Sequence, residues 1–446
     1  MVKSLFTKIN TLKKDRLVIS LVLFGILYRL LFFIIHPQVI KVPDSQSFWD
    51  LASFVGQFNL NGYNGERSPG YPIMLCLTFG FQPLIITLQF VIGIITSLLW
   101  FKICWNLKFS RKSSFWITIL LQSFTHVILY EMSILVETLT LFVISTVFWL
   151  VSAQIFTRRN SHRDLLMAIL LAYLVLIKPF YAFIPFIIFA FFFIQAPSYK
   201  LLFGRRLLII ILPLLSFFGW SYVNKINTGY FVSTTYYGLN LAQNCVHFAE
   251  KGSPEFLWII EPYVLHREIA KAENKDVAMS IWYAFNSGSF NRHKLKFADL
   301  SNELGKFAKS TIYKNPKEYF YQVVFVSWID FWKPWSLHQY IDYPNTKTHI
   351  VMQLITSVQH LLLMFLKFAY LVLIPFYFYK FLRNRSVGFE LVAATIIFSC
   401  SVLQALVTYG TNAKYSFPFE FLMIISLILF LKKAIGSRHL HNVEQL

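Results

Sequence analysis

Long apolar stretches, separated by short polar segments, make up most of this chain. A bilayer core takes about 20 apolar residues per helix, and this template predicts an all-α polytopic membrane protein with about ten transmembrane helices. The predicted ranges are 17–36, 83–105, 112–130, 133–156, 164–179, 181–196, 206–224, 350–380, 388–408 and 416–433. The fifth and sixth ranges are separated only by Lys178 and Pro179, so they form either a tight hairpin or one broken helix.

The predicted spans divide the chain into three parts. Residues 1–224 form a transmembrane module whose first outer loop is 37–70, and residues 350–446 supply the C-terminal transmembrane helices. Between spans seven and eight, residues 225–349 carry 14 basic and 11 acidic residues, which favours a mainly helical extracytoplasmic segment. Its aromatic amphipathic stretch 316–335, which contains three tryptophans, predicts a helix lying at the membrane interface.

The distribution of charge supports this topology. Apolar residues make up 56% of the 446 positions, and the net charge of +20 could suggest nucleic-acid binding. However, 21 of the Lys and Arg residues fall in six short separators: 3–16, 102–112, 158–163, 200–206, 380–385 and 432–438. These separators alternate with others that are poor in Lys and Arg or balanced. That pattern is typical of cytoplasmic loops and argues against a nucleic-acid partner. We therefore expect a multi-pass protein of the cytoplasmic membrane, with both termini inside and the loops 37–70, 225–349 and 409–415 outside.

The spacing of cysteines and histidines does not indicate a metal site or a redox site. The four cysteines show no CxxC or CxxH spacing, which argues against a structural zinc site or a disulfide framework. No histidines show a metal-ligand spacing, so we predict no metal site. One alternative stays open: Asp44 and Glu131 could share a divalent cation, because such ions prefer oxygen ligands.

Charged residues gather at the predicted outer rim. Charged residues in a bilayer are costly unless they are paired or hydrated, so each one is expected to have a structural or functional role. The set comprises Asp44, Glu66, Arg67, Glu131, Glu137, Lys178 and Lys414, with Arg29 a turn or two deeper. We expect them to converge on one site. The alternatives are structural: Glu137 could pair with Arg29, and Asp44 could cap the helix predicted from Ser45.

Several short motifs occur in a fixed order along the chain. They are Asp44-Ser45 with Phe48 and Ala52, Arg67-Ser68-Pro69-Gly70-Tyr71-Pro72, Glu137-Thr138-Leu139, Lys178-Pro179, Gly229-Tyr230-Phe231-Val232-Ser233-Thr234 with Gly238-Leu239-Asn240-Leu241, and Lys414-Tyr415-Ser416-Phe417-Pro418. This ordered set resembles the GT-C membrane glycosyltransferases, most closely the O-mannosyltransferase-like branch that includes the lipid A aminoarabinose transferases. The chain departs from the pattern at positions 178 and 414, where Lys replaces the usual Arg, and at Phe421, where a second Pro is common.

The resemblance implies a GT-C-like fold and a donor sugar carried on a polyprenyl phosphate. It also implies an extracytoplasmic acceptor, which could be a lipid, a glycan or a protein. On this hypothesis Asp44 is the base that takes the acceptor proton, Glu137 is a second catalytic residue, and transfer inverts the anomeric carbon. The predicted substrate-binding residues are Arg67, Tyr71, Lys178, Lys414, Tyr415, Arg29 and Glu131. The cations among them would neutralise the leaving phosphate.

Two other functions fit the same sequence patterns. A glycolipid flippase or transporter would also combine many spans with buried charges, although transporters often show two related halves. A non-catalytic subunit that keeps the fold without the activity is the third possibility. The Lys substitutions at positions 178 and 414 are compatible with it, whereas retention of Asp44 argues against it.

Overall fold

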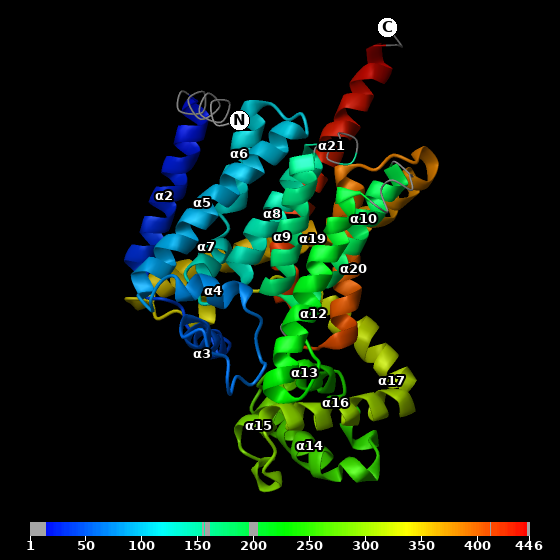
Figure 1. Ribbon diagram of the computed structural model, residues 1–446. Helices are drawn as coiled ribbons and strands as arrows, with labels where there is room; N and C mark the ends of the chain where they lie inside the picture. Colours follow the sequence, from blue (N-terminus) through cyan, green and yellow to red (C-terminus); the bar gives the residue numbers. More distant parts are fainter. Residues whose placement is uncertain (1–14, 154–155, 157–160, 196–203, 411, 444–446) are drawn as a thin grey trace.

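The computed structural model describes residues 15–153, 156, 161–195, 204–410 and 412–443 (Figure 1). Within these ranges the chain is all-helical, as predicted. Its one pairing of extended backbone there is an isolated bridge between Ile40 and Ser133. Most helices form one bundle, and a smaller helical unit lies below it in the view of Figure 1.

Five helices are long and apolar enough to cross a membrane. They are α2 (Arg16–Ile35), α5 (Gln82–Asn106), α12 (Leu208–Thr228) with its leading turn η2 (Arg205–Leu207), α19 (Thr346–Asn384) and α20 (Phe389–Val407). By length and composition, these helices support the predicted polytopic membrane protein in its coarse form.

The predicted helix 112–130 is divided into two. It consists of α6 (Arg111–Gln122) and α7 (Thr125–Glu131), which are bent by 65° and count as a sixth span only if taken together. Gln359 of α19 reaches the break, where its amide accepts from the Thr125 backbone N–H and donates to the Ser123 carbonyl. A side chain therefore satisfies the backbone groups that the bend exposes.

The remaining predicted ranges also fall on helices. They are α8 (Glu137–Ser152), α9 (Ser161–Ile177), α10 (Ile184–Gln195) and α21 (Glu420–Val443). All ten predicted ranges therefore contain helix, while the number that cross a membrane stays a prediction. The helix expected to begin at position 133 begins at Glu137, so this acid stands in the first turn of α8.

A hairpin resolves the ambiguity between the fifth and sixth ranges. The chain leaves α9 at Ile177 and turns through Lys178 into the 3-10 helix η1 (Pro179–Phe183), which leads into α10. At the far end of α10, the Gln195 side chain accepts from the Val387 backbone N–H in the α19–α20 connection. α10 therefore returns to the end of the bundle from which α9 started.

The two ends of the bundle differ in composition. The α5–α6 and α19–α20 connections and the end of α21 lie at the upper end in Figure 1, and these carry basic separators. The first loop with α3 (Ser45–Gly56) and α4 (Gly70–Cys76) lies at the lower end, beside the small helical unit. Parts of three basic separators, at 3–14, 158–159 and 200, lie outside the described residues.

The small unit has an apolar core of its own, which includes Leu239, Ile260, Ile281 and Phe307. Its α-helices are α13 (Tyr237–Gln243), α14 (Leu257–Ala272), α15 (Ser280–Asn286) and α16 (Phe297–Lys314). Short 3-10 turns connect them: η3 (Ala249–Lys251), η4 (Pro254–Phe256), η5 (Val277–Met279) and η6 (Asn291–His293). The prediction of helical structure in 225–349 is thus supported.

The predicted interfacial helix 316–335 is shorter than expected. It comprises α17 (Pro316–Tyr321), a π-helical turn η7 (Gln322–Ser327) and α18 (Trp328–Phe331), and it ends at residue 331. The Trp328 indole donates to the Ser401 hydroxyl of α20, and Trp332 is buried. These two tryptophans therefore pack on the protein. The chain then passes through the 3-10 turn η8 (His338–Tyr340) into α19.

Candidate active site

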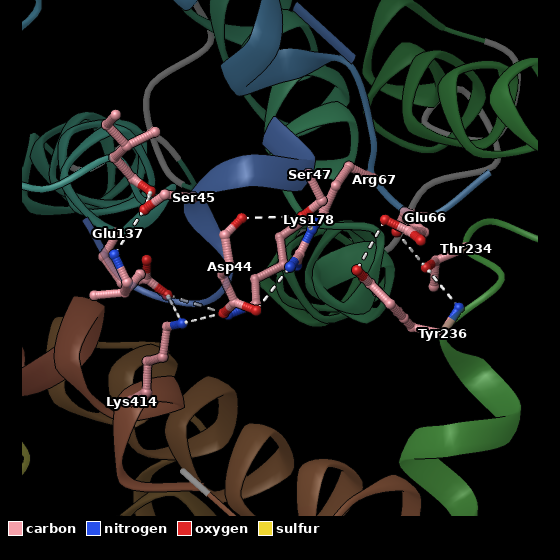
Figure 2. Close-up of polar contacts among 12 residues, drawn as sticks. Asp44, Ser45, Ser47, Glu66, Arg67, Glu137, Lys178, Thr234, Tyr236 and Lys414 are labelled. Atoms are coloured by element: carbon pink, nitrogen blue, oxygen red, sulfur yellow. Dashed lines mark hydrogen bonds and ion pairs between the residues drawn. The ribbon is translucent and has the colours of Figure 1, made fainter. Parts of the chain in front are cut away.

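Asp44 lies at the start of α3 but does not cap that helix, so the capping alternative is wrong. It occupies the N-cap position without a side-chain hydrogen bond to the helix. Its carboxylate instead accepts from Arg67 Nη2 at 2.7 Å and from Lys414 Nζ at 2.9 Å (Figure 2). The side chain is 43% exposed, so a carboxylate paired with two cations still faces solvent.

The guanidinium of Arg67 is held in a fixed orientation. Its Nε donates to the Ser47 hydroxyl at 2.7 Å, and that hydroxyl donates to the Asp44 backbone carbonyl at 2.9 Å. The guanidinium also lies between two aromatic rings, 4.4 Å from the centroid of Phe48 and 4.7 Å from that of Tyr236. Such stacking favours Arg over Lys at this position, because the guanidinium is planar and weakly hydrated.

Lys414 and Lys178 flank a second carboxylate behind Asp44. Lys414 stands in the 3-10 turn η9 (Asn412–Tyr415), 3.9 Å from Glu137 Oε1, and Lys178 is 3.5 Å from the same oxygen. Glu137 is 1% exposed, and neither of its buried oxygens has a hydrogen-bond partner among the described residues. Buried polar groups are normally satisfied, so this carboxylate has unused bonding capacity beside two ammonium groups.

We call Asp44, Arg67, Glu137, Lys178 and Lys414 the site cluster. It contains three cations and two carboxylates, so it carries one surplus positive charge. Burial alone would raise the pKa of Asp44, but Lys414 and Arg67 together hold it well below its ordinary value. Asp44 is therefore an anion at neutral pH in this state, and its two partners would also suit a phosphate group.

Local packing explains why distant segments meet here. The Gly70 backbone lies against the end of α9, where an added Cβ would approach the Ile177 backbone nitrogen to 2.6 Å. The Ser68 hydroxyl donates to the Ile177 carbonyl, and the Tyr173 hydroxyl donates to the Gly70 carbonyl. These contacts fix the loop that carries Arg67 against the helix end that precedes Lys178.

A second set of contacts fixes the loop that carries Asp44. The Ile40 backbone N–H donates to the Met132 carbonyl, and the Ile134 N–H donates to the Ile40 carbonyl. The Ser45 hydroxyl donates to the Ile134 carbonyl as well. The loop is thereby attached to the turn between α7 and α8, which places Asp44 near Glu137.

Two residues predicted for the site lie elsewhere. Arg29 and Glu131 form a bidentate pair with contacts of 2.7 and 2.6 Å, and they are 1% and 2% exposed. Both Glu131 oxygens therefore accept from Arg29 and Glu131 is not paired with Asp44, and Arg29 does not pair with Glu137. An added Cβ at Gly93 of α5 would overlap the Glu131 carboxylate, so glycine at that position makes room for the pair.

The two predicted tyrosines have different positions. Tyr71 is fully buried, its hydroxyl donates to Gln89 at 3.2 Å, and its ring packs edge-on against Phe48. It supports the loop and does not face a substrate, which corrects its predicted role. Tyr415 is partly exposed, and the Lys178 ammonium lies 3.9 Å from its ring centroid, so Tyr415 belongs to the rim of the site.

Tyr236 and Thr234, next to the small unit, complete one edge of the site. Neither Tyr236 nor Ser47 of α3 was predicted as a site residue. The Tyr236 hydroxyl donates to the Glu66 carboxylate at 2.9 Å, and the Thr234 hydroxyl donates to the Glu66 carbonyl (Figure 2). Burial raises the pKa of Glu66. Two motifs, 229–234 and 238–241, pointed to this region, but neither gave a sign that Tyr236 lies on Arg67.

A second buried charge network also escaped the sequence analysis. Glu420 accepts from His126 at 2.7 Å and pairs with Lys367 at 2.7 Å, and Lys367 also donates to the Ser416 hydroxyl. These charges lie inside otherwise apolar helices, and no motif marked them. Across the residues that the structure describes, no group of three or more His, Cys, Asp or Glu is placed to hold a metal ion.

Comparison with known proteins adds no family assignment. No model of a protein family matches this chain, and no curated protein matches it significantly. The geometry of the site cluster and the ordered motifs that carry the resemblance are therefore the two observations that bear on function.

Proposed function

We propose that this protein is a membrane glycosyltransferase that moves a sugar from a polyprenyl-phosphate donor to an extracytoplasmic acceptor. One observation carries the proposal: the half-exposed Asp44 carboxylate lies between Arg67 and Lys414, with the unsatisfied Glu137 behind. An aspartate able to accept a proton and a surplus of cations beside it are what transfer from a sugar phosphate requires.

The distribution of basic residues between the two ends of the bundle indicates on which side of the membrane the site cluster lies. The described basic separators lie at the end opposite Asp44 (Figure 1). If that basic end is cytoplasmic, as the positive-inside rule favours, the site cluster opens outward and both termini are inside. Nucleotide sugars are cytoplasmic, so an outward-facing site would use a donor that has already crossed the membrane on a lipid.

An exchange of ion-pair partners would give Asp44 its proposed role. A carboxylate with a strongly lowered pKa is a poor proton acceptor at neutral pH. When the donor phosphate binds, it competes with Asp44 for Arg67 and Lys414, and the pKa of Asp44 rises towards its ordinary value. The donor would thus turn Asp44 into a better base in the complex that needs one.

The transfer step then balances as a single displacement. The acceptor oxygen forms a bond to the anomeric carbon, its proton passes to Asp44, and the bond from that carbon to the phosphate oxygen breaks. The leaving polyprenyl phosphate takes the electron pair and an added negative charge, which Arg67, Lys178 and Lys414 neutralise. Glu137 holds the two lysines in place. Attack opposite the leaving group inverts the anomeric centre.

The test uses purified protein and a panel of polyprenyl-phosphate donors with radiolabelled hexoses or pentoses, supplied with a total envelope extract as acceptor. Asp44→Asn and Asp44→Ala are expected to lower transfer at least roughly 100-fold. The matched control is Asp50→Asn, which removes an exposed carboxylate from the same helix α3 and leaves transfer unchanged.

Other outcomes separate the alternatives. Normal transfer by both Asp44 variants would overturn the base assignment. Donor movement across vesicle membranes without a new glycosidic bond would identify a transporter. Neither transfer nor movement with any donor of the panel would favour a non-catalytic subunit.

A further inference from the structure

Two phenylalanines lie in the turns after α3 and α4, where the backbone does not favour them. Phe58 and Phe79 follow the ends of these helices, and both have a φ of 51°. A bulky residue rarely adopts this left-handed conformation, which favours Gly or Asn. Among the described residues, the other four non-glycine positions with positive φ carry Lys, Asn or Arg. Local backbone preference therefore does not account for an aromatic side chain at either turn.

The same two side chains are the most exposed large apolar groups of the described residues. Phe58 is 99% exposed and Phe79 is 94% exposed. Leu77 and Phe81, on either side of Phe79, are 65% and 62% exposed, and Ile73 of α4 is 42% exposed. We call these five residues the apolar patch. Exposed apolar groups gathered in this way mark a surface that meets a partner or a membrane.

Packing joins the two turns to each other and to the site cluster. A Cβ added to Gly56, at the end of α3, would lie 3.2 Å from the Cys76 Sγ at the end of α4, so the two helix ends are adjacent. Phe48 of α3 also packs edge-on against Tyr71 of α4, with ring centroids 5.4 Å apart. The position of α4 in a membrane would therefore fix the position of α3, and with it that of Asp44.

The surroundings of the apolar patch favour lipid as its partner. The chain has no charged residue between Arg67 and Lys102, so α4, its turn and most of α5 form one uncharged stretch. Phe81 directly precedes Gln82, the first residue of the apolar span α5. In Figure 1, α4 lies at the lower end of the bundle, where α2 ends and α5 begins. An apolar surface that continues a membrane span at this level suits the bilayer interface.

We propose that Phe58 and Phe79 anchor the first outer loop by inserting into the bilayer interface beside the site cluster. Their rings enter the boundary between head groups and acyl chains, and the apolar area removed from water offsets the conformational cost of the two turns. The insertion holds α3 at the membrane surface, so that Asp44 meets lipid head groups. It does not depend on the proposed sugar transfer, because it concerns only where the loop lies.

Electron paramagnetic resonance of the full chain in phosphatidylcholine liposomes measures the depth of the apolar patch. Phe58→Cys and Phe79→Cys each carry a nitroxide label in a Cys76→Ser background, because the other three cysteines are buried. Both labels are expected to collide several-fold more often with oxygen, which concentrates in the bilayer, than with a water-soluble nickel complex. The matched control is Asn274→Cys, an exposed position with the same φ of 51° in the small unit, where the preference is reversed.

A double variant separates a membrane anchor from a role in folding. F58G/F79G removes both rings and suits the left-handed backbone of the two turns, so in detergent it should unfold within a few degrees of the natural protein. With the label placed at Leu77→Cys, the same double variant should show a several-fold weaker preference for oxygen, because the two most exposed rings of the apolar patch are gone.

Several results would overturn the assignment. Labels at residues 58 and 79 that prefer the nickel complex, as the control label does, would place the apolar patch in water. An unchanged oxygen preference at residue 77 in F58G/F79G would show that the rings do not anchor the loop, and early unfolding of this variant would give them a structural role. Spin–spin broadening that disappears on dilution with unlabelled protein would identify a second copy as the partner.

Discussion

The pair formed by Arg29 and Glu131 and the cluster around Asp44 are two charged regions built in opposite ways. Glu131 accepts from Arg29 with both carboxylate oxygens, and both residues are almost fully buried. Asp44 is 43% exposed, and Glu137 beside it has two oxygens without hydrogen-bond partners among the described residues. A satisfied, enclosed pair connects helices, whereas an open and unsatisfied cluster can accept a ligand.

The largest effect is expected from breaking the enclosed pair. Arg29→Met or Glu131→Leu alone leaves a buried charge without its partner and should lower the free energy of unfolding by about 3–5 kcal/mol. The double variant Arg29→Met/Glu131→Leu leaves no unpaired charge and should recover most of that loss. Thermal unfolding in detergent measures all three variants. A double variant as unstable as the sum of the single ones would contradict the account.

Removing a cation from the site cluster should act on the donor and have little effect on the fold. Lys414→Gln removes one charged contact to the proposed phosphate, a loss of about 1.5–3 kcal/mol of donor binding. Lys414 is 13% exposed, but its partner Asp44 is 43% exposed and Glu137 keeps Lys178 at 3.5 Å, so the same variant should unfold within a few degrees of the natural protein. Lys414→Arg keeps the charge and is the matched control. Donor titrations of Lys414→Gln with an unchanged dissociation constant would remove Lys414 from the site.

Gly93 of α5 provides a separate test of the pair formed by Arg29 and Glu131, because its missing side chain leaves room for that pair. Gly93→Ala places a methyl group where the Glu131 carboxylate lies, so it should cost about 1–3 kcal/mol of stability. Gly219→Ala in α12 meets no atom within 4 Å and should be neutral or slightly stabilising, because alanine favours helix. Equal unfolding temperatures for the two variants would show that the space at Gly93 is not required.

The smallest effect concerns pH. Asp44 has a lowered pKa in the folded chain, so its ion pairs stabilise the fold above the ordinary carboxyl pKa of about 4, and this contribution is lost as pH falls below it. Because Asp44 is half-exposed, the contribution is about 0.5–1 kcal/mol. The stability difference between the natural protein and Asp44→Asn should stay constant from pH 8 to 5 and shrink below pH 4. A difference that widens as the pH falls would contradict this sign.

Patterns along the sequence predicted the helices well, because apolar length alone specifies a membrane helix. They also predicted one shared site for Asp44, Arg67, Glu137, Lys178 and Lys414, because these residues belong to ordered motifs on the same predicted side of the membrane. The pattern could not tell which acid pairs with which base. Glu131 and Glu137 are six residues apart, yet one is enclosed with Arg29 and the other faces two lysines.

Other features depended on packing that a single sequence does not reveal. The bend between α6 and α7 requires Gln359, more than 200 residues away in the sequence. The ring of Tyr236 reaches Arg67 only because the small unit folds back against the first loop. Tyr71 was predicted to bind substrate from its place in the motif 67–72, but its ring is fully buried against Phe48.

Asp44→Asn and Glu131→Gln are to be compared side by side for both sugar transfer and thermal unfolding. We predict that Asp44→Asn loses transfer at least roughly 100-fold while unfolding close to the natural protein. We predict the reverse for Glu131→Gln, which unfolds early but transfers sugar normally in its folded fraction. Transfer near the natural rate by a folded Asp44→Asn protein would show that Asp44 is not the base.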